Sequence, residues 1–216
     1  MPKLAADTTS KRDHAYHSIR RLLVLQQLKP GERIREPEWA QRLGVHRSAL
    51  REAFARLEAE GLIERGARTG YFVPEMTEQD VQEITKLRLA LECLAIEEIC
   101  SAPRPLPLDS MRQVVKELEQ FVRREYSLGT LEADRRFHEE LIDLAGSRRL
   151  STLYHRAPLP LIHNDTQDKD AWRDAAQRTL AEHQQILAAL EQRNAPKATL
   201  LLRNHLSHHP LLPICR

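Results

Sequence analysis

The chain has 216 residues, of which 41% are hydrophobic and 30% are charged, a composition typical of a globular protein with one large domain or two small ones. No apolar run approaches the length of a membrane span and no signal peptide opens the chain, which argues against a membrane protein or a secreted one. The three cysteines show neither CxxC nor zinc-finger spacing, so we expect reduced thiols of a cytoplasmic protein.

Charge is distributed unevenly along the chain. Residues 1–74 contain 14 Lys and Arg against 9 Asp and Glu, whereas residues 75–216 contain 19 against 22. A basic first third favours a polyanionic partner for that part of the chain only. Leu, Ala, Glu, Arg and Gln are abundant and glycine is scarce, so we expect a mainly helical protein.

The first 74 residues predict a small module of helices and strands. We expect a loose tail over residues 1–10. The spacing of apolar residues then predicts three helices, at 11–28, 36–43 and 47–59. Pro30 and Gly31 end the first helix, and Gly44 separates the other two. The stretch LIERGARTGYFV, a basic centre between apolar ends, predicts a two-stranded hairpin.

After Pro74 the pattern changes to long helices. Thr77, followed by Asp80, resembles a helix N-cap, and the helix that it starts should reach Ser101. Further helices are predicted at 109–127, 129–145, 148–157, 169–193 and 196–208, with a break at 157–168. The fold class is therefore mainly α, with a small helix-helix-hairpin module over 1–74 and an all-helical domain over 75–216.

The stretch LGVHRSALREAF, residues 43–54, has helix-turn-helix spacing. Gly44 can take the positive φ that the turn needs, and Val45 and Leu50 would fill the angle between the helices. The polar residues at the start of the second helix would then face a major groove: His46, Arg47, Ser48 and Arg51. Arginine can bind guanine through two hydrogen bonds, and a helix N-terminus favours a phosphate.

The hairpin tip, Arg65-Gly66-Ala67-Arg68, would form a basic wing suited to the adjacent minor groove or the DNA backbone. A surface helix with solvated arginines is the alternative interpretation. The turn glycine, the arginines, the wing and the charge balance agree, however, and together they favour binding of double-stranded DNA.

The stretch LKPGERIREPEWAQRLGVHRSALREAFARLEAEGLIERGARTGYFV resembles the winged helix-turn-helix of the GntR superfamily of bacterial transcription regulators. The resemblance covers roughly residues 10–74. It implies that Arg47 and Arg51 contact operator bases, that Ser48 contributes nearby, and that the region of Gly66 forms the wing tip. The sequence departs from the family at His46, where Ser or Thr is usual, and at Ala49, where Pro is common, and these differences concern the operator sequence.

Polar residues interrupt the apolar stripes of three helices in the second domain. Asp134 and His138 lie four residues apart on one stripe, and His183 and His205 interrupt two others. From His183 to Asn194 a helix rises about 16 Å, and from Pro196 to His205 the next helix descends about 14 Å, so the two imidazoles should lie at nearly the same height.

These four residues, Asp134, His138, His183 and His205, form a nitrogen-rich set that suits a divalent transition metal. Zn and Ni are the first choices, and Mn, Fe and Co remain open. The alternative interpretation is that each histidine is an ordinary hydrogen-bonded core residue.

Arg88 shares a helix face with Ile84, Leu91 and Ala95, which predicts a buried guanidinium. A buried guanidinium needs a partner. Glu92, one turn on, could provide it, and the alternative is that Arg88 clamps a ligand carboxylate.

Residues 77–208 resemble the FCD ligand-binding domain of the FadR subgroup, through KLRLALE, DRRFHEELIDLAG, EHQQILAAL and RNHL. The resemblance implies an antiparallel bundle of six or seven helices, with Asp134, His138, His183 and His205 as metal ligands and Arg88 near the effector. Members of this group often sense small organic acids that complete the coordination of the metal. Arg193-Asn194 departs from the Gly-Asp that the family often has at that hairpin turn.

The sequence thus predicts a transcription regulator rather than an enzyme. It should be a nucleoid-associated homodimer that reads a palindromic operator, because one module makes too few contacts for a specific affinity. A small carboxylate effector would modulate operator binding. The alternatives are a metal-dependent hydrolase of helical-bundle type, for which no general base is clearly placed beside the metal, and an adaptor whose bundle only dimerises.

Overall fold

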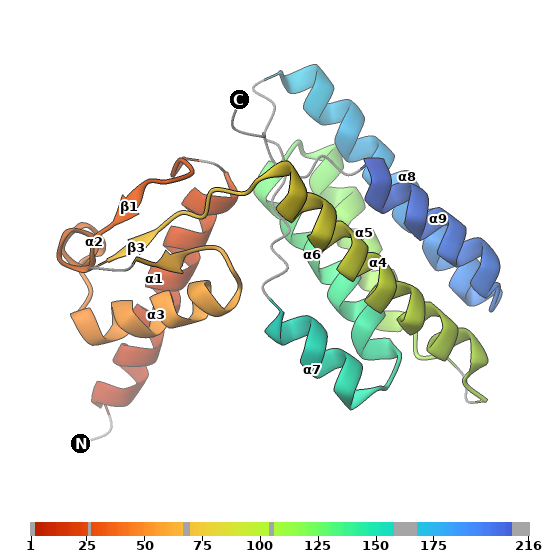
Figure 1. Ribbon diagram of the computed structural model, residues 1–216, viewed down its shortest axis with the longest axis horizontal. Helices are drawn as coiled ribbons and strands as arrows, with labels where there is room; N and C mark the ends of the chain where they lie inside the picture. The colour runs from red at the N-terminus through yellow and green to blue at the C-terminus, as the bar shows by residue number, and fades with distance from the viewer. Residues whose placement is uncertain (1–2, 26, 67–69, 104–105, 158–167, 209–216) are drawn as a thin grey trace. The chain divides into compact units, whose positions relative to one another are not determined.

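The computed structural model describes residues 3–25, 27–66, 70–103, 106–157 and 168–208 (Figure 1). The chain is mainly helical and divides into two compact units. The first comprises the described residues up to Thr77 together with Arg156 and Ala157, and the second comprises Glu78–His155 and the described residues from Asp168 on. None of the helices in the described ranges combines the length and the hydrophobicity needed to cross a membrane.

The first unit consists of three helices and a small antiparallel sheet. Its elements are α1 (Lys3–Val24), β1 (Arg33–Ile34), α2 (Glu36–Leu43), α3 (Arg47–Ala59), β2 (Glu64–Arg65) and β3 (Tyr71–Phe72). The strand order is β1-β3-β2, and Phe72 is opposite Arg33 on one side and Glu64 on the other.

One expectation about this unit is wrong, and one of its elements is not predicted by the sequence. The chain is helical from Lys3, where a loose tail was expected, and no Gly or Pro occurs between Lys3 and Val24 to interrupt a helix. The predicted hairpin is present as β2 and β3, but a third strand, β1, pairs with β3. With only two residues, β1 is too short to show the alternation by which a strand is recognised.

The core of the first unit lies between α1, α3 and the sheet. Ile19 of α1 and Leu50 and Leu57 of α3 are fully buried. Phe54 of α3 packs against Tyr71 of β3, with ring centroids 4.7 Å apart. These apolar contacts hold α3 by one face only, which leaves its opposite face to solvent.

The turn between α2 and α3 depends on one glycine. Gly44 has a φ of 63° and ends α2; its N–H donates to the carbonyl of Gln41, and the N–H of Val45 donates to that of Ala40. Val45 and Leu50, which follow the turn, are buried beneath it. No atom lies within 4 Å of a Cβ added at Gly44, so backbone conformation, and not space, favours glycine here.

The second unit is a bundle of α4 (Glu78–Ser101), α5 (Asp109–Arg123), α6 (Ser127–Leu144), α7 (Arg148–Arg156), α8 (Lys169–Glu191) and α9 (Ala195–His208). Helix α4 packs against α6 and α9, α5 packs against α6 and α8, and α8 packs against α9. Its fully buried apolar side chains include Ile96, Met111, Leu118, Phe137, Leu190 and Leu202. The predicted break at 157–168 falls mostly outside the described residues.

The boundary between α5 and α6 lies a few residues before the predicted one. Helix α5 ends at Arg123, Glu125 adopts a φ of 50°, and α6 begins at Ser127. Gly129 therefore lies inside the first turn of α6. A Cβ there would come within 2.5–2.8 Å of the rings of Tyr126 and Phe121, so this glycine is required by close packing.

The hairpin between α8 and α9 sets these two helices antiparallel. Arg193 has a φ of 52°, and its guanidinium donates hydrogen bonds to the carbonyls of Cys100, at 3.3 Å, and Ala102. The Asn194 side chain accepts a hydrogen bond from the backbone N–H of Lys197 at 3.1 Å, which caps the start of α9. Arginine thus anchors this turn to the end of α4, where the family often has glycine.

Replacing Gly44 tests how far the recognition helix depends on its turn. Because Ala disfavours the left-handed region, Gly44→Ala should destabilise the first unit by about 1–2 kcal/mol. Gly44→Asn should lose less, since Asn tolerates this conformation. Chemical denaturation followed by circular dichroism measures both, and equal stability of the Ala variant and the wild type would contradict the assigned turn.

Candidate functional site

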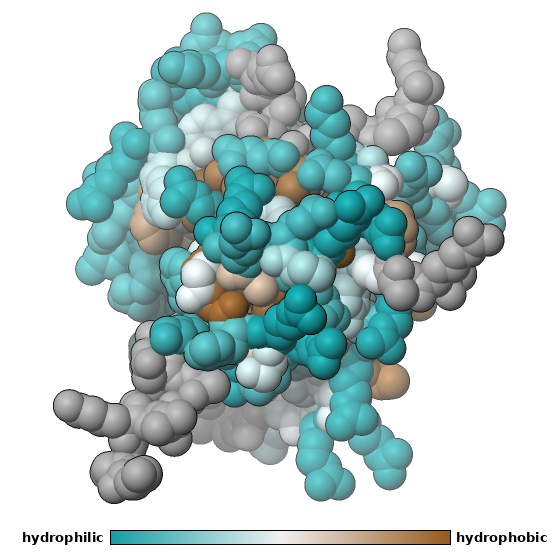
Figure 2. Space-filling model, turned by 90° about the vertical axis from the view of Figure 1, so that its left-hand side faces the viewer, coloured by the Kyte–Doolittle hydropathy of each residue, from teal (hydrophilic) through white to brown (hydrophobic). Residues whose placement is uncertain are grey.

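The first turn of α3 presents polar side chains to solvent. His46, Arg47, Ser48 and Arg51 are exposed, whereas Ala49, Leu50 and Ala53 face the core. Figure 2 views the protein from the side on which α2 and α3 are drawn in Figure 1. The surface that it shows is mostly hydrophilic. The sequence predicted this division, and a solvent-facing recognition helix requires it.

Arg51 already has an intramolecular partner. Its Nε donates a hydrogen bond to Glu36 of α2 at 2.8 Å, and its side chain remains 64% exposed. An exposed ion pair of this kind contributes little to stability, so a phosphate or a base edge can replace it at small cost. Glu36 orients the arginine without removing it from the surface.

The wing is described only in part. Gly66 lies against Phe72, and a Cβ at Gly66 would overlap that ring. The Arg65 guanidinium lies 5.8 Å from the centroid of the Tyr71 ring. Arg68, also predicted to contact DNA, lies outside the described residues. Glycine is therefore needed at the start of the tip because an aromatic side chain of β3 occupies the space.

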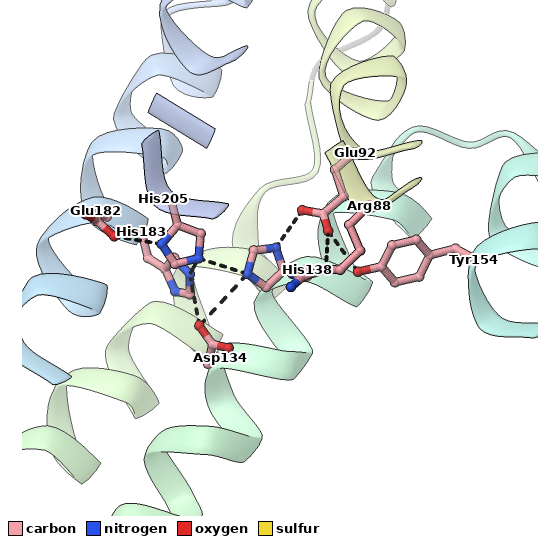
Figure 3. Close-up of polar contacts among 8 residues, drawn as sticks. All are labelled: Arg88, Glu92, Asp134, His138, Tyr154, Glu182, His183 and His205. Carbon is pink, nitrogen blue, oxygen red and sulfur yellow. Dashed lines mark hydrogen bonds and ion pairs between the residues drawn. The ribbon is translucent and has the colours of Figure 1, made fainter. Parts of the chain in front are cut away.

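Four polar side chains meet in the interior of the bundle (Figure 3). Asp134 and His138 come from α6, His183 from α8 and His205 from α9, and all four are buried. The Nε2 atom of His205 lies 3.1 Å from that of His138 and 3.3 Å from that of His183. The antiparallel hairpin of α8 and α9 thus brings His183 and His205 together, as the calculation from the rise per residue predicts.

Asp134 completes this cluster with an oxygen. Its Oδ1 lies 3.3 Å from His183 Nε2 and 3.9 Å from His138 Nε2. One ligand atom from each of the four residues lies within 4.8 Å of the others. With metal–ligand distances of about 2.1 Å, neighbouring ligand atoms are about 3.4 Å apart in a tetrahedral site and about 3.0 Å apart in an octahedral one. The cluster therefore has the dimensions of a metal site.

Two carboxylates bond to the outer nitrogens of these histidines. His138 Nδ1 lies 2.6 Å from Glu92 Oε2, and His205 Nδ1 lies 2.7 Å from Glu182 Oε2. An ionised carboxylate only accepts hydrogen bonds, so each Nδ1 carries a proton, and in a neutral ring the Nε2 then presents a lone pair. Two lone pairs facing each other at 3.1 Å repel, and a cation between them would remove the repulsion.

The surroundings of His138 and Glu92 keep these two side chains in the protonation states that metal binding needs. Burial lowers the pKa of His138 to about 4, against the opposing effect of Glu92, so the ring is neutral near pH 7. Burial alone would raise the pKa of Glu92, but His138 and Arg88 outweigh it and lower that pKa to about 2. A neutral imidazole oriented by an ionised carboxylate is the usual arrangement of a metal-binding histidine.

An aromatic ring positions the third histidine. His183 stacks on Phe137 of α6 with centroids 3.8 Å apart and an angle of 9° between the planes. Phe137 and His183 are both fully buried. The ring of His183 is therefore held in one plane by packing, with its Nε2 directed toward Asp134 and His205.

Arg88 lies beside this cluster, fully buried, on α4. Its Nε donates a hydrogen bond to Glu92 Oε1 at 3.0 Å, as one of the two interpretations predicted. Neither Nη1 nor Nη2 has a hydrogen-bond partner within the described part of the chain. Burial opposes the positive charge, but Glu92, Tyr154 and Asp134 together raise the pKa of Arg88. The guanidinium can thus pair with Glu92 and still offer two terminal nitrogens to an anion.

Sequence reasoning missed several residues of this site. Tyr154 of α7 donates a hydrogen bond to Glu92 Oε1 at 3.0 Å, and Glu182 and Phe137 hold the outer sides of His205 and His183. For Glu92, the sequence indicates only a role as the partner of Arg88. None of the three missed residues interrupts an apolar stripe, which was the signal used for the other four.

Matches to two family models cover most of the chain. The model of bacterial regulatory proteins of the gntR family matches residues 11–73, and that of the FCD domain matches residues 83–208. The chain belongs to the GntR family and contains an FCD domain.

Relatives of this GntR-family chain are transcription regulators. The uncharacterized HTH-type transcriptional regulator YdhC of Bacillus subtilis (strain 168) is 30% identical over 203 residues, which cover 89% of this chain and 86% of YdhC. The chain is thus a DNA-binding transcription regulator and not an enzyme.

Two solved structures have the same fold. The putative GntR regulator from Rhodococcus sp. RHA1 gives a TM-score of 0.69 at 24% identity, over 92% of this chain and 94% of its own. The Escherichia coli protein McbR/YncC also gives 0.69, at 20% identity, over 93% of each chain.

The buried pair of Arg88 and Glu92 allows a test by substitution. Arg88→Leu would leave a buried carboxylate without its cation, and removing one member of such a pair costs about 3–5 kcal/mol. Urea denaturation should show this loss. Arg112, half-exposed and paired with Asp109 and Glu191, provides the control, and Arg112→Leu should change stability little. Equal effects of the two substitutions would contradict the buried pair.

Proposed function

We propose that this GntR-family regulator senses a small organic acid through a metal ion in its FCD domain, and that the acid changes the affinity of the chain for its operator. The main support is the meeting of three imidazole Nε2 atoms and one carboxylate oxygen in the buried interior of the bundle (Figure 3). A DNA-binding regulator needs an input, and this cluster is a chemically suitable receiver for one.

The donor set guides the choice of metal. Asp134, His138, His183 and His205 would supply three imidazole nitrogens and one carboxylate oxygen. Such a set suits Zn or Ni first, and also Mn, Fe and Co. A metal held this way supplies a Lewis-acidic centre for the oxygen atoms of a bound acid.

Arg88 would hold the carboxylate of the effector. Its Nη1 and Nη2 are buried and without a hydrogen-bond partner among the described residues, which is costly unless a ligand satisfies them. An anion that bound both the metal and these two nitrogens would be selected by charge and by size. A small carboxylate fits this requirement.

The DNA-binding surface would consist of His46, Arg47, Ser48 and Arg51 on α3, with Gly66 and Arg68 of the wing. We place this module over residues 1–74 and the effector-binding module over 75–216. The functional form would be a cytoplasmic, nucleoid-associated homodimer on a palindromic operator, since one module offers too few contacts. Along the chain only residues 73–77 separate β3 from α4, which contains Arg88, so a change at α4 has a short covalent route to the wing.

The hydrolase alternative receives no support. The relatives are transcription regulators, and the two carboxylates nearest the histidines, those of Glu92 and Glu182, are bonded to imidazole Nδ1 atoms. Neither is left to act as a general base toward a metal-bound water.

Substitution of Arg47 tests the recognition helix. Arg47→Ala should weaken binding to an operator duplex selected in vitro by about 1–3 kcal/mol and relax sequence preference at the bases that it contacts. The control is Arg123→Ala, which removes the same charge from an exposed position of α5. Fluorescence anisotropy at fixed salt measures both. Unchanged affinity of the Arg47 variant would argue against the assigned helix.

Substitution of His183 tests the metal site. His183→Ala removes one of four donors, so the purified variant should lose its metal by elemental analysis. His155→Ala is the control, because His155 is 38% exposed and bonds to Asp143 on the surface. Full metal occupancy in the His183 variant, or equal loss in both, would refute the site.

A further inference from the structure

Glu92 connects Arg88 and His138 through hydrogen bonds. Its Oε1 accepts hydrogen bonds from Arg88 Nε and from the Tyr154 hydroxyl, both at 3.0 Å. Its Oε2 accepts from His138 Nδ1 at 2.6 Å. Figure 3 shows this carboxylate between the histidine on one side and the arginine and tyrosine on the other. All four side chains are buried.

We propose that Glu92 couples the anion subsite at Arg88 to the metal subsite at His138, so that occupation of either site changes the affinity of the other. The proposal rests on the proposed function and adds the residue that links its two ligands. Such linkage is reciprocal, because a ligand that alters the affinity for a second ligand has its own affinity altered equally.

The physical basis is competition for the electron density of one carboxylate. Arg88 places a full positive charge beside Oε1, which weakens the acceptor strength of Oε2 toward His138. An anion on Nη1 and Nη2 offsets that charge. Glu92 then accepts more strongly from His138 Nδ1, the imidazole becomes a better donor at Nε2, and the metal is bound more tightly.

Tyr154 limits where this carboxylate can move. Its hydroxyl, supplied by α7, donates to the same oxygen as Arg88 does. Glu92 is therefore held from α4, α6 and α7 at once, and a change in one hydrogen bond is transmitted to the others instead of being absorbed by rotation of the side chain.

The second carboxylate of the site provides a matched comparison. Glu182 accepts from His205 Nδ1 at 2.7 Å, as Glu92 does from His138, but its side chain is 23% exposed. Within the described ranges, the structure shows no hydrogen bond or ion pair between Glu182 and Arg88. Both carboxylates should support metal binding, whereas only Glu92 should transmit the state of the anion subsite.

An amide at position 92 separates these roles. The carboxylate accepts on both oxygens, but a glutamine side chain has one acceptor oxygen and one donor nitrogen. In Glu92→Gln the amide can accept from His138 or from Arg88, but not from both through separate oxygens. One of the two connections is therefore lost while side-chain volume is kept.

The experiment measures the affinity of the full-length chain for Zn²⁺ by competition with a chromogenic chelator, in sodium acetate and in sodium chloride of equal ionic strength. Wild type should bind Zn²⁺ about 5- to 150-fold more tightly in acetate than in chloride, which is the range typical of coupled sites. We call this ratio of affinities the acetate factor. Glu92→Gln and Glu182→Gln should each weaken binding in chloride by about 10- to 100-fold. The acetate factor should persist in Glu182→Gln and be clearly reduced in Glu92→Gln, where only the contribution of acetate bound directly to the metal would remain.

A second measurement reports the histidines directly. In the metal-free protein, long-range ¹H–¹⁵N spectra should show His138 and His205 protonated on Nδ1 in the wild type. Glu92→Gln should change the spectrum of His138 alone, and Glu182→Gln that of His205 alone. If Glu92→Gln does not fold, Tyr154→Phe replaces it and should reduce the acetate factor.

Three results would overturn the coupling. The first is the absence of an acetate factor in the wild type. The second is an unchanged acetate factor in Glu92→Gln, or in Tyr154→Phe where that variant replaces it, and the third is loss of the acetate factor in both Glu92→Gln and Glu182→Gln. These results differ from failure of the proposed function. In that case the His183→Ala variant would bind Zn²⁺ as tightly as the wild type does.

Discussion

A charged side chain that leaves water must find compensation inside the protein, and the bundle of this regulator is organised around that requirement. Arg88 and Glu92 are fully buried one turn apart on α4, and Asp134, His138, His183 and His205 are buried beside them. Hydrogen bonds, ion pairs and the close approach of the imidazole Nε2 atoms join these groups into one network that draws on α4, α6, α7, α8 and α9. The network explains why helices otherwise packed by leucine and isoleucine have polar residues on their inner faces.

The first unit follows the opposite principle. Its function depends on polar side chains that remain in solvent, and its core serves to hold α3 by one face. Gly44 sets the angle at which α3 leaves the turn, and Glu36 holds Arg51 at the surface through a weak, replaceable ion pair. A strongly paired arginine would have to break its ion pair before it could contact DNA, so a weak pair suits the DNA contact that we propose for Arg51.

Prediction succeeded where the signal was local or periodic. Helices α2 and α3 begin and end at the predicted residues, because a glycine and a regular apolar stripe define them. It failed where the signal was weak or came from another part of the chain. The two-residue strand β1 shows no alternation, and the α5–α6 boundary depends on the packing of Phe121 and Tyr126 around Gly129, a contact that no local pattern encodes.

The amino-acid sequence by itself determined the four inward polar residues of the bundle, since a helix repeats every 3.6 residues and a carboxylate or imidazole on an apolar stripe is visible as an exception. The tertiary structure alone decided how their protons and orientations are held. Glu182, Tyr154 and Phe137 come from different helices, and their contacts with His205, Glu92 and His183 exist only once those helices pack. The tautomer of a histidine depends on what lies a few ångströms away in space, and helical periodicity contains no information about that distance.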